Sequence, residues 1–272
     1  MKIDRDAPIG VFDSGVGGLT VAREIMRNLP SEKIVYFGDT ARVPYGSKSK
    51  DTVIRYSRQI IHFLEEQQVK AIVIACNTAS AFALDAVKDE LNIPVLGVIE
   101  AGAKVAAKET RNKRVGVIGT LGTVGSGIHE AYLKQLDPEI TVIGKACPLF
   151  VPLVENGHFD TKVAELVTAE YLEEVKKQNV DTLIMGCTHY PLLKKTIGAF
   201  MGESVTLIDA GAEVAKELKR HFDKNELHSQ VHDKKQYQYF VSDDVCSFSE
   251  LGGIFLNKKI DGQVEKIDIE KY

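Results

Sequence analysis

Two cysteines stand out because each follows a short apolar run and precedes polar side chains. Cys76 lies in segment 70–80, KAIVIACNTAS, and Cys187 lies in segment 180–190, VDTLIMGCTHY. Short apolar runs of this kind are typical of buried strands, so we expect each thiol where a strand ends. The polar side chains that follow the two thiols are Asn77, Thr78, Thr188 and His189.

Several kinds of chemistry use cysteine, and the spacing favours one of them. A Cys–His hydrolase needs a single nucleophile and would leave the second segment unexplained. A dithiol redox pair lacks the CxxC arrangement, and the dispersed Cys and His residues show no metal-ligand spacing. Racemisation or epimerisation needs two acid–base groups, because one face of a carbon loses a proton while the other gains one. Thiols suit this task, since free cysteine has a pKa of about 8.5.

Each of these thiols has a neighbour that can take or return its proton. Asp13 would lie near Cys76 if the first and third strands are adjacent, and His189 follows Cys187 by two positions. The other two cysteines, Cys147 and Cys246, are interpreted as inert: one as packing, one as a spare thiol in a polar turn.

Two further segments have the residue types of ligand-binding turns. In segment 13–18, DSGVGG, the glycines let the backbone turn tightly and approach a ligand. A phosphate loop is disfavoured there, because the Gly-Lys-Ser/Thr ending is absent and Asp13 would repel phosphate. In loop 41–50, Pro44 and Gly46 flank Tyr45 and can hold it, with nearby N–H groups, in a defined place.

Apolar periodicity predicts strands that alternate with helices. The predicted strands are 8–12, 33–37, 71–75, 94–99, 113–118, 140–146, 180–186, 204–209, 237–242 and 264–269. The predicted helices are 19–29, 51–68, 79–91, 100–110, 125–136, 160–178 capped by Asp160, one from Pro191 onward, 210–222 and 248–256. Segment 152–157 is predicted to be a turn and 225–235 a loop.

This alternation predicts an α/β fold with mostly parallel sheets flanked by helices. The string IGVFDS at 9–14 is echoed by VGVIGT at 115–120, which suggests two similar lobes. We expect one lobe over 1–98 with 209–272, the other over 99–208, and the active site in the cleft between them. Ligands of such sheets bind beyond the carboxyl ends of strands. The residues at such ends are Asp13, Cys76, Thr120 and Cys187.

Composition excludes several classes of function. The 272 residues are 44% hydrophobic and 26% charged, as in a globular protein, with a formal net charge of −4. The dispersed basic residues argue against a nucleic-acid or membrane partner. The charged N-terminal residues do not resemble a signal peptide, and the widely spaced cysteines suit a reducing compartment, so we expect a cytoplasmic protein.

Five motifs together resemble glutamate racemases. They are DSGVGG at 13–18, GDTARVPYG at 38–46, ACNTAS at 75–80, PLVENG at 152–157 and GCTHYPLL at 186–193. The resemblance implies interconversion of L- and D-glutamate with no cofactor and no metal, supplying D-glutamate for peptidoglycan. It is also compatible with a homodimer.

The resemblance further implies a role for each motif residue. Cys76 would take the α-proton from D-glutamate with help from Asp13, and Cys187 from L-glutamate with help from His189. The substrate-binding set implied is Asp13, Ser14, Tyr45, Gly46, Asn77, Thr78, Thr188 and His189. Possible additions are Pro44, Thr120, Thr123 and Glu155, the last as a group that orients His189.

Three alternatives stay open at this point. An aspartate or related amino-acid racemase would use the same two thiols and differ in pocket length. A non-catalytic amino-acid-binding protein with two closing lobes would need no thiol. A cysteine hydrolase would need only one.

Overall fold

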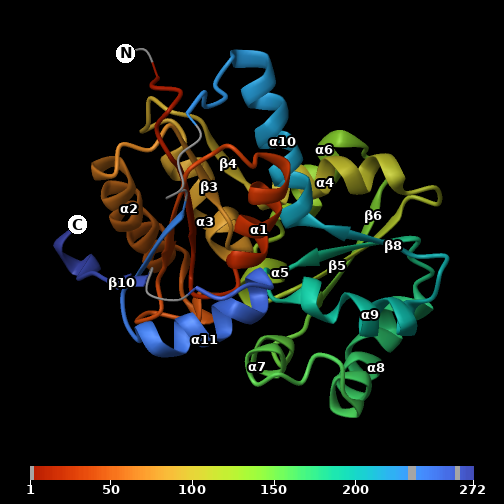
Figure 1. Cartoon of the computed structure of the whole chain (residues 1–272). Helices are drawn as coiled ribbons and strands as arrows, with labels where there is room; N and C mark the ends of the chain where they lie inside the picture. Colours follow the sequence, from red (N-terminus) through yellow and green to blue (C-terminus); the bar gives the residue numbers. More distant parts are fainter. Residues whose placement is uncertain (1–2, 232–236, 261–263) are drawn as a thin grey trace.

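Two parallel sheets, each flanked by helices, form two lobes (Figure 1). The computed structural model describes residues 3–231, 237–260 and 264–272. The six-stranded sheet of the first lobe has the order β10-β9-β2-β1-β3-β4, and the four-stranded sheet of the second lobe has the order β6-β5-β7-β8. The strands of the first sheet are β1 (Ile9–Asp13), β2 (Ile34–Gly38), β3 (Ala71–Ile74), β4 (Val95–Gly97), β9 (Tyr237–Val241) and β10 (Val264–Lys266). Those of the second are β5 (Arg114–Gly119), β6 (Thr141–Ala146), β7 (Thr182–Gly186) and β8 (Thr206–Asp209).

The strand order repeats between the lobes. The run β2-β1-β3-β4 in the first sheet corresponds to β6-β5-β7-β8 in the second, as the echoed sequence strings predict. Extending the parallel registers of β1–β3 and β5–β7 beyond their ends places Ser14 level with Cys76 and Thr120 level with Cys187. The two thiols therefore occupy equivalent positions at the carboxyl ends of equivalent strands.

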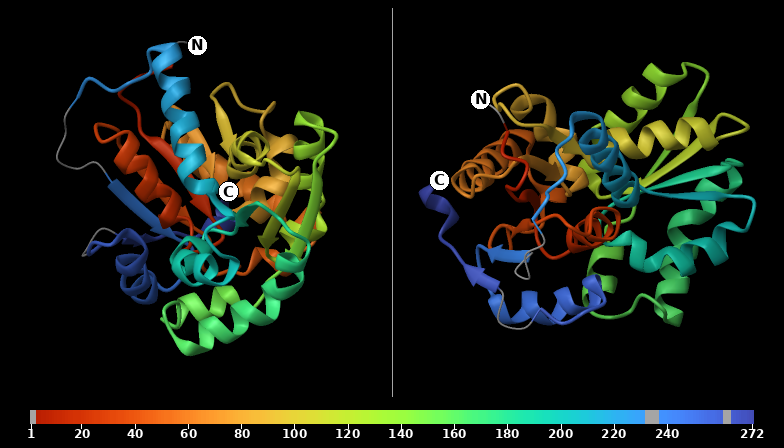
Figure 2. Two further views of the ribbon diagram at one scale, coloured as in Figure 1. Left: turned by 90° about the vertical axis from the view of Figure 1, so that its right-hand side faces the viewer. Right: turned by 45° about the horizontal axis from the view of Figure 1, so that its top comes forward.

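Helices cover the faces of both sheets and join the lobes (Figure 2). The chain leaves the first sheet through α4, returns through α10, and α10 packs against both α4 and α1. The helices are α1 (Leu19–Asn28), α2 (Lys50–Glu66), α3 (Asn77–Val87), α4 (Val98–Glu109), α5 (Leu121–Gly125), α6 (Ile128–Leu136), α7 (Phe150–Glu155), α8 (Lys162–Lys177), α9 (Lys194–Met201), α10 (Ala210–Asn225) and α11 (Val245–Leu256). Short 3₁₀ turns are η1 (Tyr45–Ser47), η2 (Tyr190–Leu193) and η3 (Ile269–Lys271).

Burial explains why the central strands are apolar throughout. Every residue of β1, β2, β3 and β7 is buried, because helices cover both faces of a parallel sheet. The edge strand β6 has no buried residue, and its sequence mixes Thr141 and Lys145 with valine and isoleucine. The strands that end at the two thiols are therefore held by the interior of each lobe.

Four local predictions are corrected by the structure. Segment 152–157 is mostly the end of helix α7 and not a simple turn. The helix predicted at 125–136 begins only at Ile128, after Gly127, whose φ of 67° lies in the left-handed region, and a separate short helix α5 precedes it. Thr161, not Asp160, caps α8, since its side chain accepts from the N–H of Ala164. The last strand ends at Lys266 and a 3₁₀ turn follows.

The loop predicted at 225–235 lies partly outside the described residues, which resume at 237. Among the described helices, none combines the length and apolar character needed to cross a membrane.

Candidate active site

The two thiols are buried where the lobes meet. The residues of Cys76 and Cys187 are 6% and 7% exposed, and the charge of Cys187 is one of the influences on the pKa of Cys76. Cys76 is the N-cap of α3, with its sulfur accepting from the N–H of Ala79 at 3.4 Å. Its thiol donates to the hydroxyl of Ser14 at 3.8 Å. Both thiols are thus largely shielded from solvent.

A buried carboxyl group lies beside the first thiol. Asp13 Oδ2 accepts from the N–H groups of Gly15 at 3.1 Å and Gly18 at 3.0 Å. Burial raises the pKa of Asp13, although the charge of His189 and these N–H donors oppose the shift. Burial and then the charge of Asp13 raise the pKa of Cys76 to about 12. Cys76 is therefore a neutral thiol near pH 7.

A histidine lies beside the second thiol. His189 Nδ1 is 3.8 Å from Cys187 Sγ and 3.5 Å from Thr188 Oγ1, and its Nε2 is 2.9 Å from Glu155 Oε1. Burial alone would lower the pKa of His189, but hydrogen bonds and charge attraction from Cys187 and Glu155 outweigh it and raise the pKa to about 10. The imidazole is thus protonated near neutral pH, and its positive charge attracts negative charge on the sulfur of Cys187.

Three threonine hydroxyls meet across the lobe boundary. Thr78 Oγ1 lies 3.0 Å from Thr120 Oγ1 and 3.1 Å from Thr123 Oγ1, and the last two are 3.0 Å apart. Thr78 lies in the first turn of α3 in the first lobe, whereas Thr120 caps α5 in the second. These hydroxyls form hydrogen bonds with one another, and each can form a hydrogen bond with a polar ligand in place of one of them.

The structure limits the expectation that Tyr45 binds substrate, because its side chain is turned away from the second lobe. The Tyr45 ring is buried against Tyr56, and its hydroxyl donates to Asp39, so its side chain is held inside the first lobe. The main chain of Gly46 faces the second lobe, since a Cβ added to Gly122 would lie 3.0 Å from the Gly46 carbonyl oxygen. A Cβ on Gly46 would lie 2.6 Å from Cβ of Thr120, which shows how closely the lobes approach here.

The structure brings the remaining predicted residues to the same place. Asn77 and Thr188 are buried next to their respective thiols, and Oδ1 of Asn77 has no hydrogen-bond partner among the described residues. One group was missed by the sequence analysis: Gly17 and Thr20, which lie directly against Thr188 and His189. The glycine-rich turn was the available signal, because a glycine without a conformational need often marks a close approach.

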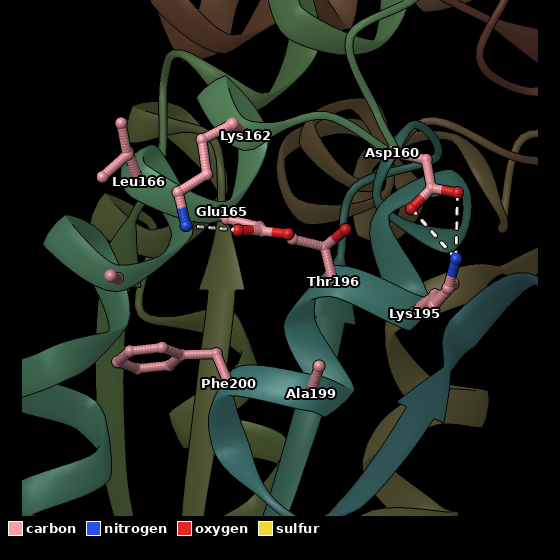
Figure 3. A pocket seen from close by; sticks show the side chains of 9 residues that line it. Asp160, Lys162, Glu165, Leu166, Lys195, Thr196, Ala199 and Phe200 are labelled. Atoms are coloured by element: carbon pink, nitrogen blue, oxygen red, sulfur yellow. Dashed lines mark hydrogen bonds and ion pairs between the residues drawn. The ribbon is translucent and has the colours of Figure 1, made fainter.

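A surface groove elsewhere on the second lobe contains no comparable pair of thiols. A groove of about 440 Å³ lies between α8 and α9 (Figure 3). Its charged side chains neutralise each other, with Lys195 2.9 Å from Asp160 and Lys162 2.7 Å from Glu165. Within the described ranges, no cluster of three or more His, Cys, Asp or Glu side chains is arranged to hold a metal ion.

Paired thiols at equivalent strand ends of two parallel-sheet lobes define a class of proteins. Residues 9–218 match the Asp/Glu/Hydantoin racemase family, and the chain belongs to this family. Over 262 residues it is 50% identical to the glutamate racemase of Geobacter metallireducens, covering 96% of this chain and 97% of that one.

Solved structures agree with this result. The structure of glutamate racemase from Francisella tularensis in complex with D-glutamate is 39% identical and superposes with a TM-score of 0.92, covering 98% of this chain and all of that one. Glutamate racemase from Thermus thermophilus, solved in complex with β-chloro-D-alanine, is 43% identical with a TM-score of 0.90, covering 99% of this chain and 100% of that one.

Proposed function

We propose that this protein is a glutamate racemase that interconverts L- and D-glutamate without a cofactor and supplies D-glutamate for peptidoglycan synthesis. One observation carries the proposal: Cys76 and Cys187 are buried at equivalent strand ends of facing lobes, each beside its own acid–base partner. The relatives named above supply the substrate class, since one of them was solved with D-glutamate bound.

Proton transfer follows from the placement of the thiols. For L-glutamate, the thiolate of Cys187 takes the α-proton, and the thiol of Cys76 then delivers its proton to the opposite face of the resulting carbanion. The S–H bond formed at one sulfur replaces the one broken at the other, so proton and charge balance. D-Glutamate reacts in the reverse sense. Asp13 assists Cys76 and His189 assists Cys187, while Glu155 holds the imidazole in position.

Stabilisation of the α-carbanion is the harder requirement, because the α-proton of an amino acid is weakly acidic. The start of α3 offers main-chain N–H groups and the hydroxyl of Thr78 to a carboxylate, and the α5 start adds Thr120 and Thr123. Closed lobes exclude water, which strengthens these interactions. The proposed binding residues are Asp13, Ser14, Asn77, Thr78, Thr188 and His189 by side chain, the main chain of Pro44, Tyr45 and Gly46, and Thr120 with Thr123.

The proposal includes the division of the chain. We place one lobe at 1–98 with 209–272 and the other at 99–208, with substrate entering when they separate. Opening of this kind can limit turnover. Four free cysteines suit the reducing cytoplasm. A homodimer is also proposed, and light scattering coupled to size exclusion would test it.

A solvent-exchange experiment tests the activity. Reduced protein is incubated with D-glutamate in D₂O without cofactor, and α-proton loss and optical rotation are followed together. The two-thiol mechanism predicts that rotation decays, that L-glutamate carries deuterium, and that unreacted D-glutamate recovered early still carries hydrogen. Deuterium in both enantiomers from the start would indicate a single base.

A parallel incubation with D-aspartate separates the nearest alternative. Faster reaction of aspartate would replace glutamate in the proposal and leave the mechanism intact. Inactivity toward both amino acids would favour a two-lobed binding protein. Dependence on only one of the two cysteines would favour a hydrolase.

A further inference from the structure

The hydroxyl of Thr20 bridges the two lobes beside the second thiol. Thr20 lies on α1 of the first lobe, is 3% exposed, and its Oγ1 donates to the main-chain carbonyl of Thr188 at 2.8 Å. The same hydroxyl lies 2.9 Å from the carbonyl of Gly17, within the glycine-rich turn. Thr188 directly follows Cys187, so this hydrogen bond ends one residue away from the proposed acid–base group.

The carbonyl of Thr188 needs a donor from outside its own turn. In a 3₁₀ turn this carbonyl would accept from the residue three positions later, which is Pro191, and proline has no N–H. The next N–H, that of Leu192, donates to His189 instead. A buried carbonyl without a donor is costly, and the Thr20 hydroxyl supplies the missing hydrogen bond.

The surrounding packing makes this contact sensitive to small shifts. A Cβ on Gly17 would lie 2.3 Å from Thr188 Oγ1 and 2.5 Å from His189 Nδ1, so the turn lies directly on these two residues. Any movement of the Thr188 peptide therefore displaces the thiol on one side and the imidazole on the other. Asp13, in contrast, accepts from the N–H groups of Gly15 and Gly18 and receives no hydrogen bond from the Thr20 hydroxyl itself.

We propose that Thr20 is a positioning residue for the half of the reaction that uses Cys187. Its hydroxyl holds the Thr188 peptide so that Cys187 and His189 face the substrate when the lobes close. Thr20 itself neither touches the reacting carbon nor carries a proton. The inference rests on the proposed two-thiol racemisation and adds a residue to its machinery.

The variants Thr20→Val and Thr20→Ser separate the hydroxyl from the shape of the side chain. Valine removes the donor, and we expect kcat to fall roughly ten- to hundredfold, as for a lost buried hydrogen bond at a reacting group. Serine keeps the donor and should stay within about threefold of the parent enzyme. Thr168→Val is the matched control, because Thr168 is fully buried on α8 and its hydroxyl has no partner among the described residues.

Isotope effects distinguish positioning from general loss of structure. With α-deuterated L-glutamate, Thr20→Val should raise the kinetic isotope effect, because proton transfer to Cys187 becomes more rate-limiting. With α-deuterated D-glutamate the kinetic isotope effect should fall, because proton transfer to Cys76 is then faster than the proton transfer that involves Cys187. Loss of folded protein would lower both rates and leave both isotope effects unchanged.

Three results would overturn the inference: activity of Thr20→Val equal to that of Thr168→Val, unchanged isotope effects, or a serine variant as slow as the valine variant. If Thr20→Val does not fold by circular dichroism, Thr20→Ala is measured with the same expectations. An inactive parent enzyme would defeat the proposed function itself, whereas an active parent with an unaffected Thr20→Val defeats only this inference.

Discussion

The two lobes have the same strand order but place opposite charges beside the two thiols of the proposed active site. Next to Cys76 is the carboxyl group of Asp13, which together with burial raises the pKa of this thiol to about 12. Next to Cys187 is His189, whose pKa of about 10 keeps it positively charged at neutral pH. Equivalent positions of a repeated fold thus have different neighbours: Cys76 lies beside a carboxyl group and Cys187 beside an imidazolium. The repeated backbone places the two thiols at equivalent positions, and the side chains of Asp13 and His189 make their surroundings different.

Replacing either thiol should have the largest effect, and it should be the same for both halves. Cys76→Ser and Cys187→Ser should each lose racemisation in both directions by a factor on the order of 10³ or more, because a hydroxyl is a far weaker acid than a thiol. Polarimetry from each enantiomer measures this. Cys147→Ser is the matched control at a buried cysteine outside the proposed pair, and two-way turnover retained by either catalytic variant would rule out the two-thiol mechanism.

Replacing Asp13 or His189 should change the isotope effects of the two directions of the reaction differently. Asp13→Asn and His189→Gln should each lower kcat by roughly 10²-fold, the usual scale for a positioned acid–base group. Their isotope effects should move in opposite senses: Asp13→Asn raises the effect with α-deuterated D-glutamate, and His189→Gln raises it with α-deuterated L-glutamate. Equal changes in both variants would mean that the halves do not act independently. The ratio kcat/KM stays equal for the two enantiomers in every variant, because they have equal free energies.

Closure of the lobes can be weakened without touching either thiol. Gly46→Ala puts a methyl group 2.6 Å from Thr120, so we expect KM to rise by about tenfold as the lobes fail to meet. Gly125→Ala is the matched control, since nothing lies within 4 Å of its added Cβ. Initial rates over a range of glutamate concentrations give both constants. A normal KM for Gly46→Ala would show that the contact between η1 and α5 does not form during catalysis.

His189 also predicts a pH dependence of the free energy of unfolding. Folding raises the pKa of this imidazole from 6.5 to about 10, so its contribution is complete below pH 6.5 and is lost as the pH rises through 10. The free energy of unfolding should fall over this range by up to about 1.4 kcal/mol per pH unit. Urea titrations at several pH values measure the slope, and Glu155→Gln should reduce it. A slope unaffected by Glu155→Gln would remove the carboxylate from the explanation.

For His129, also in the second lobe, we expect the free energy of unfolding to fall as the pH becomes acid. Burial lowers the pKa of His129 from 6.5 to about 4, so its contribution is present above pH 6.5 and is lost as the pH falls through 4. His129→Leu should flatten this acid branch and leave the basic branch of His189 in place. The same titrations extended to pH 4 provide the test.

The placement of the two thiols could be predicted from sequence because both follow apolar strands. The runs before Cys76 and Cys187 fix where each thiol must lie, and parallel strands bring their carboxyl ends to one edge. The direction of Tyr45 could not be predicted in this way. Its hydroxyl bonds to Asp39, which also accepts from Arg42 and from Ser242 far along the chain.

The hydrogen bond from Thr20 to Thr188 could not be predicted from the sequence for a related reason. It depends on a missing N–H at Pro191 and on the approach of two lobes, neither of which has a periodic signature. The start of α6 at Ile128 depends on the left-handed backbone of Gly127, which apolar periodicity does not record. Patterns within one element were therefore predictable, whereas contacts between elements distant in sequence were not.

The position of β9 in the first sheet also has a consequence for synthesis of the chain. Strand β2, buried along its whole length, pairs on one side with β9, which follows about 200 residues later. At typical rates of translation this partner emerges on the order of ten seconds or more after β2 does. During that interval an apolar strand edge is open to pairing with other chains. The first lobe, although it begins the chain, is completed last, and its nascent edge is where a ribosome-associated chaperone would be most needed.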